Sequence, residues 1–246
     1  MPAINSIRFV ARLIGTAVLL GRAMMPSLML TMGVGIGFAP SAQSSQIDLS
    51  NQEIGAPPQE FKFWRAGKVD FGHWAVVREG ASGGVAIQAS GTGRADEPLL
   101  AVYTRVLAID ARIKIRFKLI DGPMPSAGIA ARVSGPDDYY VVRVSAFEQR
   151  LSLLHIVRGK PEEIAGVDAQ IAKDHWQTLE VGVRGNGFTI WLDDEWALPA
   201  FDYAKLVEGQ FGIWTERDDT TRFGQIDISP LPLVHDQSAA PDRVGG

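Results

Sequence analysis

The stretch that decides the fold is WQTLEVGVRGNGFTIWLDD, which runs from Trp176 to Asp194. Apolar side chains occupy every second position before and after the turn Gly185-Asn186-Gly187. Glycine and asparagine adopt positive φ at low cost, so two alternating runs around such a turn predict a β-hairpin. One face of each strand is apolar and the other mixed, which predicts a sheet with one face buried against a second layer.

The same alternation recurs along most of the chain. It predicts further short strands at Trp74–Val77, Gly84–Ala89, Leu99–Val106, Arg112–Ile120, Ile129–Ser134, Tyr139–Phe147, Leu151–Val157, Glu208–Glu216 and Thr221–Ile228. Residues Ile164–Lys173 and Tyr203–Val207 are expected to form single helical turns. Short strands that are separated by frequent turns, without a long amphipathic helix, predict an all-β, two-sheet antiparallel jelly-roll sandwich.

The N-terminal segment has the pattern of a targeting sequence. Three arginines precede an apolar run over residues 23–38, and the small residues Ala39-Pro40-Ser41-Ala42 follow it. This order is typical of a secretory signal peptide, and a retained membrane anchor is the alternative. We therefore expect a signal peptide over residues 1–42, a linker over 43–60, the jelly roll over 61–229 and a disordered tail over 230–246. The mature protein would be periplasmic or secreted, without a stable membrane span.

Composition excludes several classes of function. The chain has 246 residues, a formal net charge of -4 and no cysteine. The absence of cysteine excludes disulfides and thiol catalysis. Near-neutral charge without a basic run argues against nucleic acid as a partner.

Several segments resemble one bacterial family. They are Asp138–Glu148, Leu151–Gly159, His175–Leu179, the WLDD strand end and Gly209–Thr215. In this order they resemble the concanavalin A-like jelly-roll family known as 3-keto-disaccharide hydrolase domains, over roughly residues 110 to 228. The resemblance implies export, a two-sheet jelly roll and a carbohydrate or glycoside as partner. The chain departs from the family at Asp193-Asp194, where an Asp-Gly pair is usual, and at Glu216–Asp219.

The conventional glycosidase pattern is missing from the predicted strands. Retaining glycosidases of this broad fold place carboxylates at every second position of one strand, so that all face the scissile bond. No predicted strand has such a run, and Asp193-Asp194-Glu195 is contiguous, as in a solvated turn.

A different set of polar and aromatic residues falls on the faces opposite the apolar ones. It comprises Arg116, Arg132, Arg143, Ser145, Trp191, Trp214 and Glu216. If their strands are neighbours, we expect Arg132, Ser145, Trp191 and Trp214 to bind substrate. Glu216 would act as a base and Arg143 would stabilise an enolate. Ordinary cross-strand ion pairs are the alternative interpretation of the charged members.

Other polar residues are assigned structural roles. His155 falls on the same side of its predicted strand as Leu151 and Leu153, so it is expected on the core face. Asp137-Asp138 and Asp218-Asp219 are acidic turns, for which we expect no bound metal, although such oxygens suit Ca²⁺. We expect no cofactor. Two hypotheses remain: a carbohydrate-active jelly roll that binds and cleaves a glycoside or 3-keto-glycoside, and a non-catalytic glycan-binding or cell-envelope interaction module.

Overall fold

The computed structural model describes residues 45–65, 72–80, 84–91, 98–201, 207–216 and 218–232. These residues form strands and turns, and they contain no helix. Consequently, no described helix is long and apolar enough to cross a bilayer. The predicted signal peptide, most of the predicted tail and the helical turn predicted at residues 203–207 lie largely or wholly outside the described residues.

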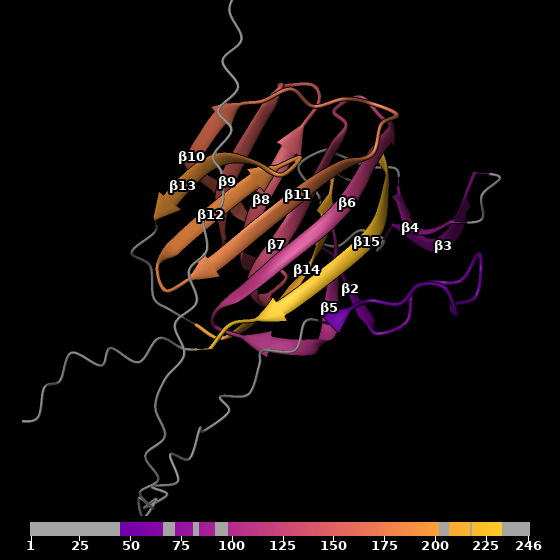
Figure 1. Ribbon diagram of the computed structural model, residues 1–246, viewed down its shortest axis with the longest axis horizontal. Coiled ribbons are helices and arrows are strands. Elements are labelled where there is room, and N and C mark those ends of the chain that lie inside the picture. The colour runs from indigo at the N-terminus through magenta and orange to yellow at the C-terminus, as the bar shows by residue number, and fades with distance from the viewer. Residues whose placement is uncertain are drawn as a thin grey trace, which may run out of the picture. The chain divides into compact units, whose positions relative to one another are not determined.

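The strands form two antiparallel sheets, and Figure 1 shows them as two layers. Sheet A has the order β13 (Glu195–Phe201), β12 (Gly187–Leu192), β11 (Gln177–Arg184), β6 (Ala111–Asp121), β15 (Thr220–Pro230), β4 (Gly84–Ser90) and β3 (His73–Glu79), and β1 (Ser45–Gln46) also pairs with β15. Sheet B has the order β10 (Lys160–Asp168), β9 (Arg150–Val157), β8 (Asp138–Ser145), β7 (Ser126–Gly135), β14 (Gly209–Thr215), β5 (Leu99–Ala108) and β2 (Phe61–Arg65).

The hairpin predicted from Trp176–Asp194 is confirmed as β11 and β12. Its register pairs Arg184 with Gly187 and Leu179 with Leu192, so the Gly185-Asn186 turn lies where the sequence places it. Strand β11 also pairs with β6, which brings the hairpin into the middle of sheet A.

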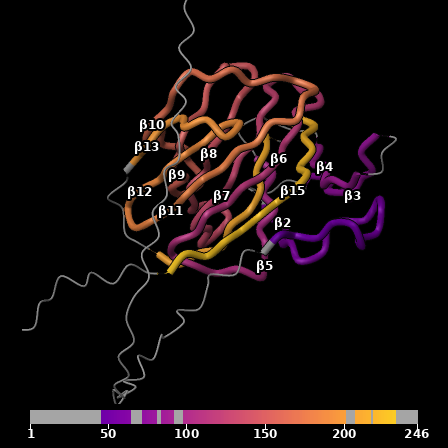
Figure 2. Tube along the Cα trace, viewed as in Figure 1, coloured from indigo at the N-terminus to yellow at the C-terminus, as the bar shows by residue number. Residues whose placement is uncertain are grey.

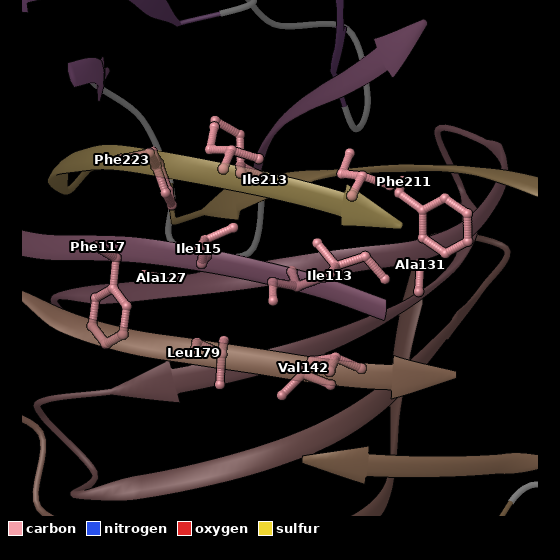
Figure 3. Packing of buried hydrophobic residues seen from close by; sticks show 14 of the residues in the cluster. Ile113, Ile115, Phe117, Ala127, Ala131, Val142, Leu179, Phe211, Ile213 and Phe223 are labelled. Carbon is pink, nitrogen blue, oxygen red and sulfur yellow. The ribbon is translucent and has the colours of Figure 1, made fainter. Parts of the chain in front are cut away.

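One continuous apolar core lies between the two sheets. Figure 3 shows Ile113, Ile115 and Leu179 of sheet A packed with Val142 and Ile213 of sheet B. All five side chains are almost fully buried, as the alternation predicts. Burial of apolar area on this scale is the main favourable contribution to folding.

Four strands were not expected. Strand β1 lies in the segment expected to be a linker and pairs with β15, and β2, before the first predicted strand, pairs with β5. The segment predicted to start a helical turn at Ile164 instead continues strand β10, and residues 195–201 form β13. Strands β10 and β13 are edge strands that pair with one neighbour in their sheet and contain a proline, Pro161 or Pro199. A proline lacks the N–H that a central strand needs, so it is tolerated at a sheet edge.

The chain crosses between the layers at the β14–β15 connection. Strand β14 lies in sheet B and β15 in sheet A, and Figure 2 follows this path along the trace. Glu216, Asp218 and Asp219 lie in this connection. It therefore places several carboxylates at one end of the sandwich.

Candidate functional site on the outer face of sheet B

The site is built around Arg143. Its guanidinium forms ion pairs with Glu148, in the turn after β8, and with Glu216, directly after β14. The Arg143 Nη1 and Glu216 Oε1 atoms are 3.2 Å apart. The prediction that Arg143 and Glu216 meet is thus confirmed, and a planar guanidinium between two carboxylates is a strong, directional hydrogen-bonding unit.

A glycine allows this arrangement across three strands. In the register of sheet B, Arg143 lies opposite Gly128 of β7, and Gly128 lies opposite Trp214 of β14. A Cβ atom at Gly128 would lie 2.8 Å from the Val142 carbonyl oxygen and 3.3 Å from the Trp214 ring. The indole therefore packs over the backbone of β7 at a position that admits no side chain.

Trp214 lies on the predicted face, but its ring is only 5% exposed. It belongs to a second apolar cluster, on the outer face of sheet B, together with Tyr139, Val141, Leu154 and Ile156. Burial in this cluster raises the pKa of Tyr139 to about 12. Trp214 is therefore a supporting residue and not the open aromatic platform that the sequence suggests.

Phe147 is the exposed aromatic residue next to the site. It precedes Glu148 in the turn between β8 and β9, and it is 67% exposed. The predicted binding residue Ser145 is buried, and its Oγ accepts a hydrogen bond of 3.2 Å from the Glu148 backbone N–H. Ser145 thus fixes the turn that carries Glu148 and Phe147.

A second charged group extends the site over β9 and β10. Arg150 Nη2 lies 2.6 Å from Glu163 Oε1, and Ser152 Oγ donates to Glu163 Oε2 at 3.1 Å. Ser152 lies directly opposite Arg143 in the register of the two strands. The hydrogen bond from Arg150 lowers the pKa of Glu163, which keeps this carboxylate ionised at neutral pH.

In the β14–β15 connection, unlike at Glu163, the pKa values of two carboxyl groups are raised. Burial raises the pKa of Glu216 to about 7, against the opposing effect of Arg143. Burial also raises the pKa of Asp219 to about 6, although Ser126 donates from its N–H at 3.0 Å and its Oγ at 3.2 Å. Glu216, Asp218 and Asp219 each offer a carboxylate oxygen within 4.8 Å of the others, so they are the described residues able to hold a metal ion.

Three of the predicted residues do not join this site. Arg132 is 3% exposed at the far end of β7, where it donates to the carbonyls of Ile109 at 3.0 Å and Gly185 at 2.6 Å. A register shift after Ala131 and a positive φ at Arg132 turn the chain there. The prediction that Arg132 lies beside Arg143 is therefore wrong.

Trp191 and Arg116 lie on the other sheet. Trp191, on β12, packs beneath the Arg112 guanidinium, which is 5.3 Å from its ring centroid. Arg116, on β6, lies 5.0 Å from the ring centroid of Trp176. Alternation placed both side chains on the correct outer side of their own strands. Because these strands belong to sheet A, the prediction that Trp191 and Arg116 share one face with Arg143 is wrong. On this face of sheet A, Glu180 forms cross-strand ion pairs with Arg112 and Lys114.

The core assignment of His155 is confirmed by its ring contact. Its imidazole stacks on Tyr140, a core residue, with ring centroids 4.2 Å apart and an angle of 11° between the planes. His155 therefore contributes to packing on the inner face of sheet B.

A separate hollow of about 830 Å³ lies near the edge strands β10 and β13. Trp196, which is 61% exposed, lines it together with Gln149, Asp168, Gln170 and Glu195. An exposed indole beside amides and carboxylates suits a polar ligand with apolar faces. This hollow could not be expected from the sequence pattern, because strand β13 was not predicted.

Comparisons with known proteins support the fold. No protein-family model matches the chain, and no curated protein matches it. Among solved structures, the carbohydrate binding module CBM66 from Bacillus subtilis is similar with a TM-score of 0.57 and 19% identity, covering 69% of this chain and 95% of that one. The chain is a jelly roll.

Two further structures agree. The Bacillus licheniformis β-glucanase has a TM-score of 0.52 and 8% identity, covering 76% of this chain and 98% of that one. The VIP36 exoplasmic/lumenal domain, solved in its Ca²⁺/Man-bound form, has a TM-score of 0.50 and 13% identity, covering 72% and 85%. At these identities the likeness establishes the fold alone, a two-sheet jelly roll, which confirms the predicted fold class. The finer resemblance to 3-keto-disaccharide hydrolase domains stays a prediction.

Proposed function

We propose that this protein is an exported glycan-binding domain and that the outer face of sheet B, around Arg143, binds the sugar. The observation that carries the proposal is the Arg143 guanidinium held between Glu148 and Glu216, with the exposed residue Phe147 in the same turn as Glu148. Fixed charged groups bind neighbouring sugar hydroxyls through directional hydrogen bonds, and an aromatic ring covers the apolar face of a pyranose.

The neighbouring polar groups fit the same role. Arg150, Glu163 and Ser152 are linked to one another and lie beside Arg143 across β8 and β9. Because they are already oriented, little side-chain entropy is lost when they exchange partners for hydroxyls. The shared fold with a carbohydrate binding module and with a domain in a Man-bound form lends further support.

Export is part of the proposal. It rests on the charged, apolar and small-residue order of residues 1–42, which fits a cleaved signal peptide. N-terminal sequencing of the secreted or periplasmic protein tests this point. A mature N-terminus in the low forties supports export with cleavage, and an intact Met1 in that pool contradicts it.

A glycan array followed by calorimetric titration of the tightest-binding oligosaccharide tests the binding function. Glu148→Gln keeps the shape of the side chain but removes the charge that orients Arg143, so we expect affinity to fall at least about tenfold. Glu53→Gln, an exposed change in the segment before β2, is the matched control and should bind normally. An array without any bound glycan would overturn the proposal.

A second candidate function is cleavage of a 3-keto-glycoside, which the contact of two carboxylates with one arginine favours. A carbonyl at the 3-position acidifies the neighbouring C–H. Glu216 would accept the proton from C2, and Arg143 would stabilise the enolate. Collapse of the enolate would form a C1–C2 double bond and break the bond from C1 to the glycosidic oxygen, which would leave with the proton returned by Glu216, and water would then add across the double bond. Incubation with 3-keto-glucosides tests this function. Turnover that Glu216→Gln abolishes supports cleavage, and binding without turnover supports the glycan-binding domain alone.

A further inference from the structure

Three carboxylate oxygens in the β14–β15 connection are buried without a hydrogen-bond donor. They are Glu216 Oε2, Asp218 Oδ1 and Asp219 Oδ1. Glu216 is 5% exposed and Asp219 is 1% exposed. Buried carboxylate oxygens normally accept hydrogen bonds, because loss of hydration without a new partner is costly.

Two other oxygens of this cluster are already engaged. Glu216 Oε1 faces Arg143, and Asp219 Oδ2 accepts two hydrogen bonds from Ser126. The unpartnered oxygens of these two residues are therefore different atoms from those that bond Arg143 and Ser126. One carboxylate oxygen from each of the three residues lies within 4.8 Å of the others, which is the spacing of ligands around a single ion.

The charge balance also calls for a cation. Three carboxylates gather here, and the arginine bonded to the cluster, Arg143, is shared with Glu148. Among the described residues, this one shared arginine does not offset the charge of all three carboxylates when they are ionised, in a region from which water is largely excluded. A divalent ion would supply the missing positive charge and would also be coordinated by the oxygens that lack a hydrogen-bond donor.

The backbone holds Asp219 in place for this role. Gly122, at a φ of 132°, packs so closely on Asp219 that a Cβ atom there would overlap its carboxylate. Ser126 fixes the other oxygen of the same carboxylate. The Asp219 Oδ1 atom thus has a defined position, as expected of a ligand in a preformed site.

The chemistry of the donors selects the ion. All three are hard carboxylate oxygens, and the cluster offers no histidine or cysteine. Hard oxygen donors suit Ca²⁺ or Mg²⁺, and Ca²⁺ tolerates the irregular geometry of ligands drawn from one short turn. We propose that Glu216, Asp218 and Asp219 bind one divalent cation, with Ca²⁺ preferred over Mg²⁺.

This proposal does not depend on glycan binding, since the cation contacts oxygens that do not face Arg143. It does bear on the second candidate function. A cation on Glu216 Oε2 would lower the proton affinity of that carboxylate. Bound cation should therefore weaken Glu216 as a base, so added Ca²⁺ should slow any turnover that depends on it.

Calorimetric titration of CaCl₂ into chelator-treated protein, without any sugar, tests the site. We expect one Ca²⁺ per chain and a rise of the unfolding temperature by several degrees at about 10 mM Ca²⁺, well above the weak end of protein Ca²⁺ sites at about 10⁻³ M. Asp218→Asn, at the least buried of the three positions, should weaken Ca²⁺ binding at least about tenfold. Asp174→Asn, an exposed acid outside the cluster, should bind as wild type does.

Amide hydrogen exchange of the wild-type chain keeps the test valid if Asp218→Asn does not fold. Added Ca²⁺ should slow exchange at residues 218–221 and 124–126, whose backbone surrounds the cluster. Absence of Ca²⁺ binding at about 10 mM, tighter binding of Mg²⁺ than of Ca²⁺, unchanged affinity in a folded Asp218→Asn variant, or protection elsewhere would each overturn the proposal.

Discussion

The Arg143 guanidinium lies 3.2 Å from the Glu216 carboxylate although the two residues are 73 positions apart in the chain. The contact spans β8, β7 and β14 and depends on Gly128 between them. Both side chains are largely buried, so the ion pair compensates Glu216 for lost hydration, and Arg143 shares its charge between Glu216 and Glu148.

Removal of the arginine should therefore be costly. We expect Arg143→Met to lower the free energy of unfolding by about 3 kcal/mol, because it leaves Glu216 buried without its charge partner. Glu216→Gln in the same chain should recover part of this loss. Chemical denaturation of the single and double variants measures the coupling, and additive effects would show that the ion pair contributes nothing.

Gly128 should not tolerate a side chain. Gly128→Ala places a methyl group against the Val142 carbonyl and the Trp214 ring, so we expect a loss of about 1–3 kcal/mol in unfolding free energy. Gly135→Ala, at the other end of β7, is the control, since its added methyl group would meet open space. Equal stability of the two variants would mean that Trp214 does not pack over β7.

Tyr139 should make the fold sensitive to alkali. Burial raises its folded-state pKa from 10 to about 12, so the folded chain holds the phenolic proton more tightly than the unfolded chain does. The stability due to this group is fully present below pH 10 and is lost as the pH rises towards about 12. A difference of two pKa units corresponds to roughly 2–3 kcal/mol.

The variant Tyr139→Phe isolates this effect. The wild type should lose more unfolding free energy than Tyr139→Phe as the pH rises from 9 to about 12. In a phenol absorbance titration of the variant, the tyrosine that ionises at the highest pH in the wild type should be missing. Parallel stability curves for the two proteins would contradict the buried position of the Tyr139 hydroxyl.

Arg132 should matter for stability and not for the ligand. Its guanidinium bonds the Ile109 and Gly185 carbonyls and pairs with Asp110, which also accepts from the Gly185 N–H. Arg132→Met should remove the donor to both carbonyls and the charge partner of the buried Asp110, and lower the free energy of unfolding by about 3 kcal/mol. Glycan affinity of the remaining folded protein should stay within about twofold of wild type, well under the tenfold change that 1.4 kcal/mol produces. A loss of glycan affinity without a loss of stability would instead show that Arg132 takes part in glycan binding.

Alternation along each strand could be predicted from the sequence, and it placed the side chains of Arg143, Trp214 and Trp191 on the correct sides of their strands. It could not assign strands to sheets, because two antiparallel sheets that share one core have the same alternation. Trp191 was therefore grouped with Trp214, although β12 and β14 lie in different layers.

Other features had no signal in a local pattern. Pro161 and Pro199 interrupt the strand pattern, so the edge strands β10 and β13 were not predicted. Glu163 and Trp196, which lie on these strands, were therefore not recognised as candidate site residues. The hydrogen bonds between Ser126 and Asp219 join the start of β7 to the β14–β15 connection, 93 positions apart, which only the sheet topology brings together. Arg132 has the right alternation, but the bulge after Ala131 changes its direction.

Hydrogen exchange of the protein with and without its tightest-binding glycan tests the central claim most directly, since it locates the bound sugar on the chain. We predict slower exchange in the β8–β9 turn, at residues 145–150, and in the adjoining end of β7. Protection confined to residues 168–172 and 195–197 would instead assign the sugar to the hollow beside Trp196 and contradict the proposed site around Arg143.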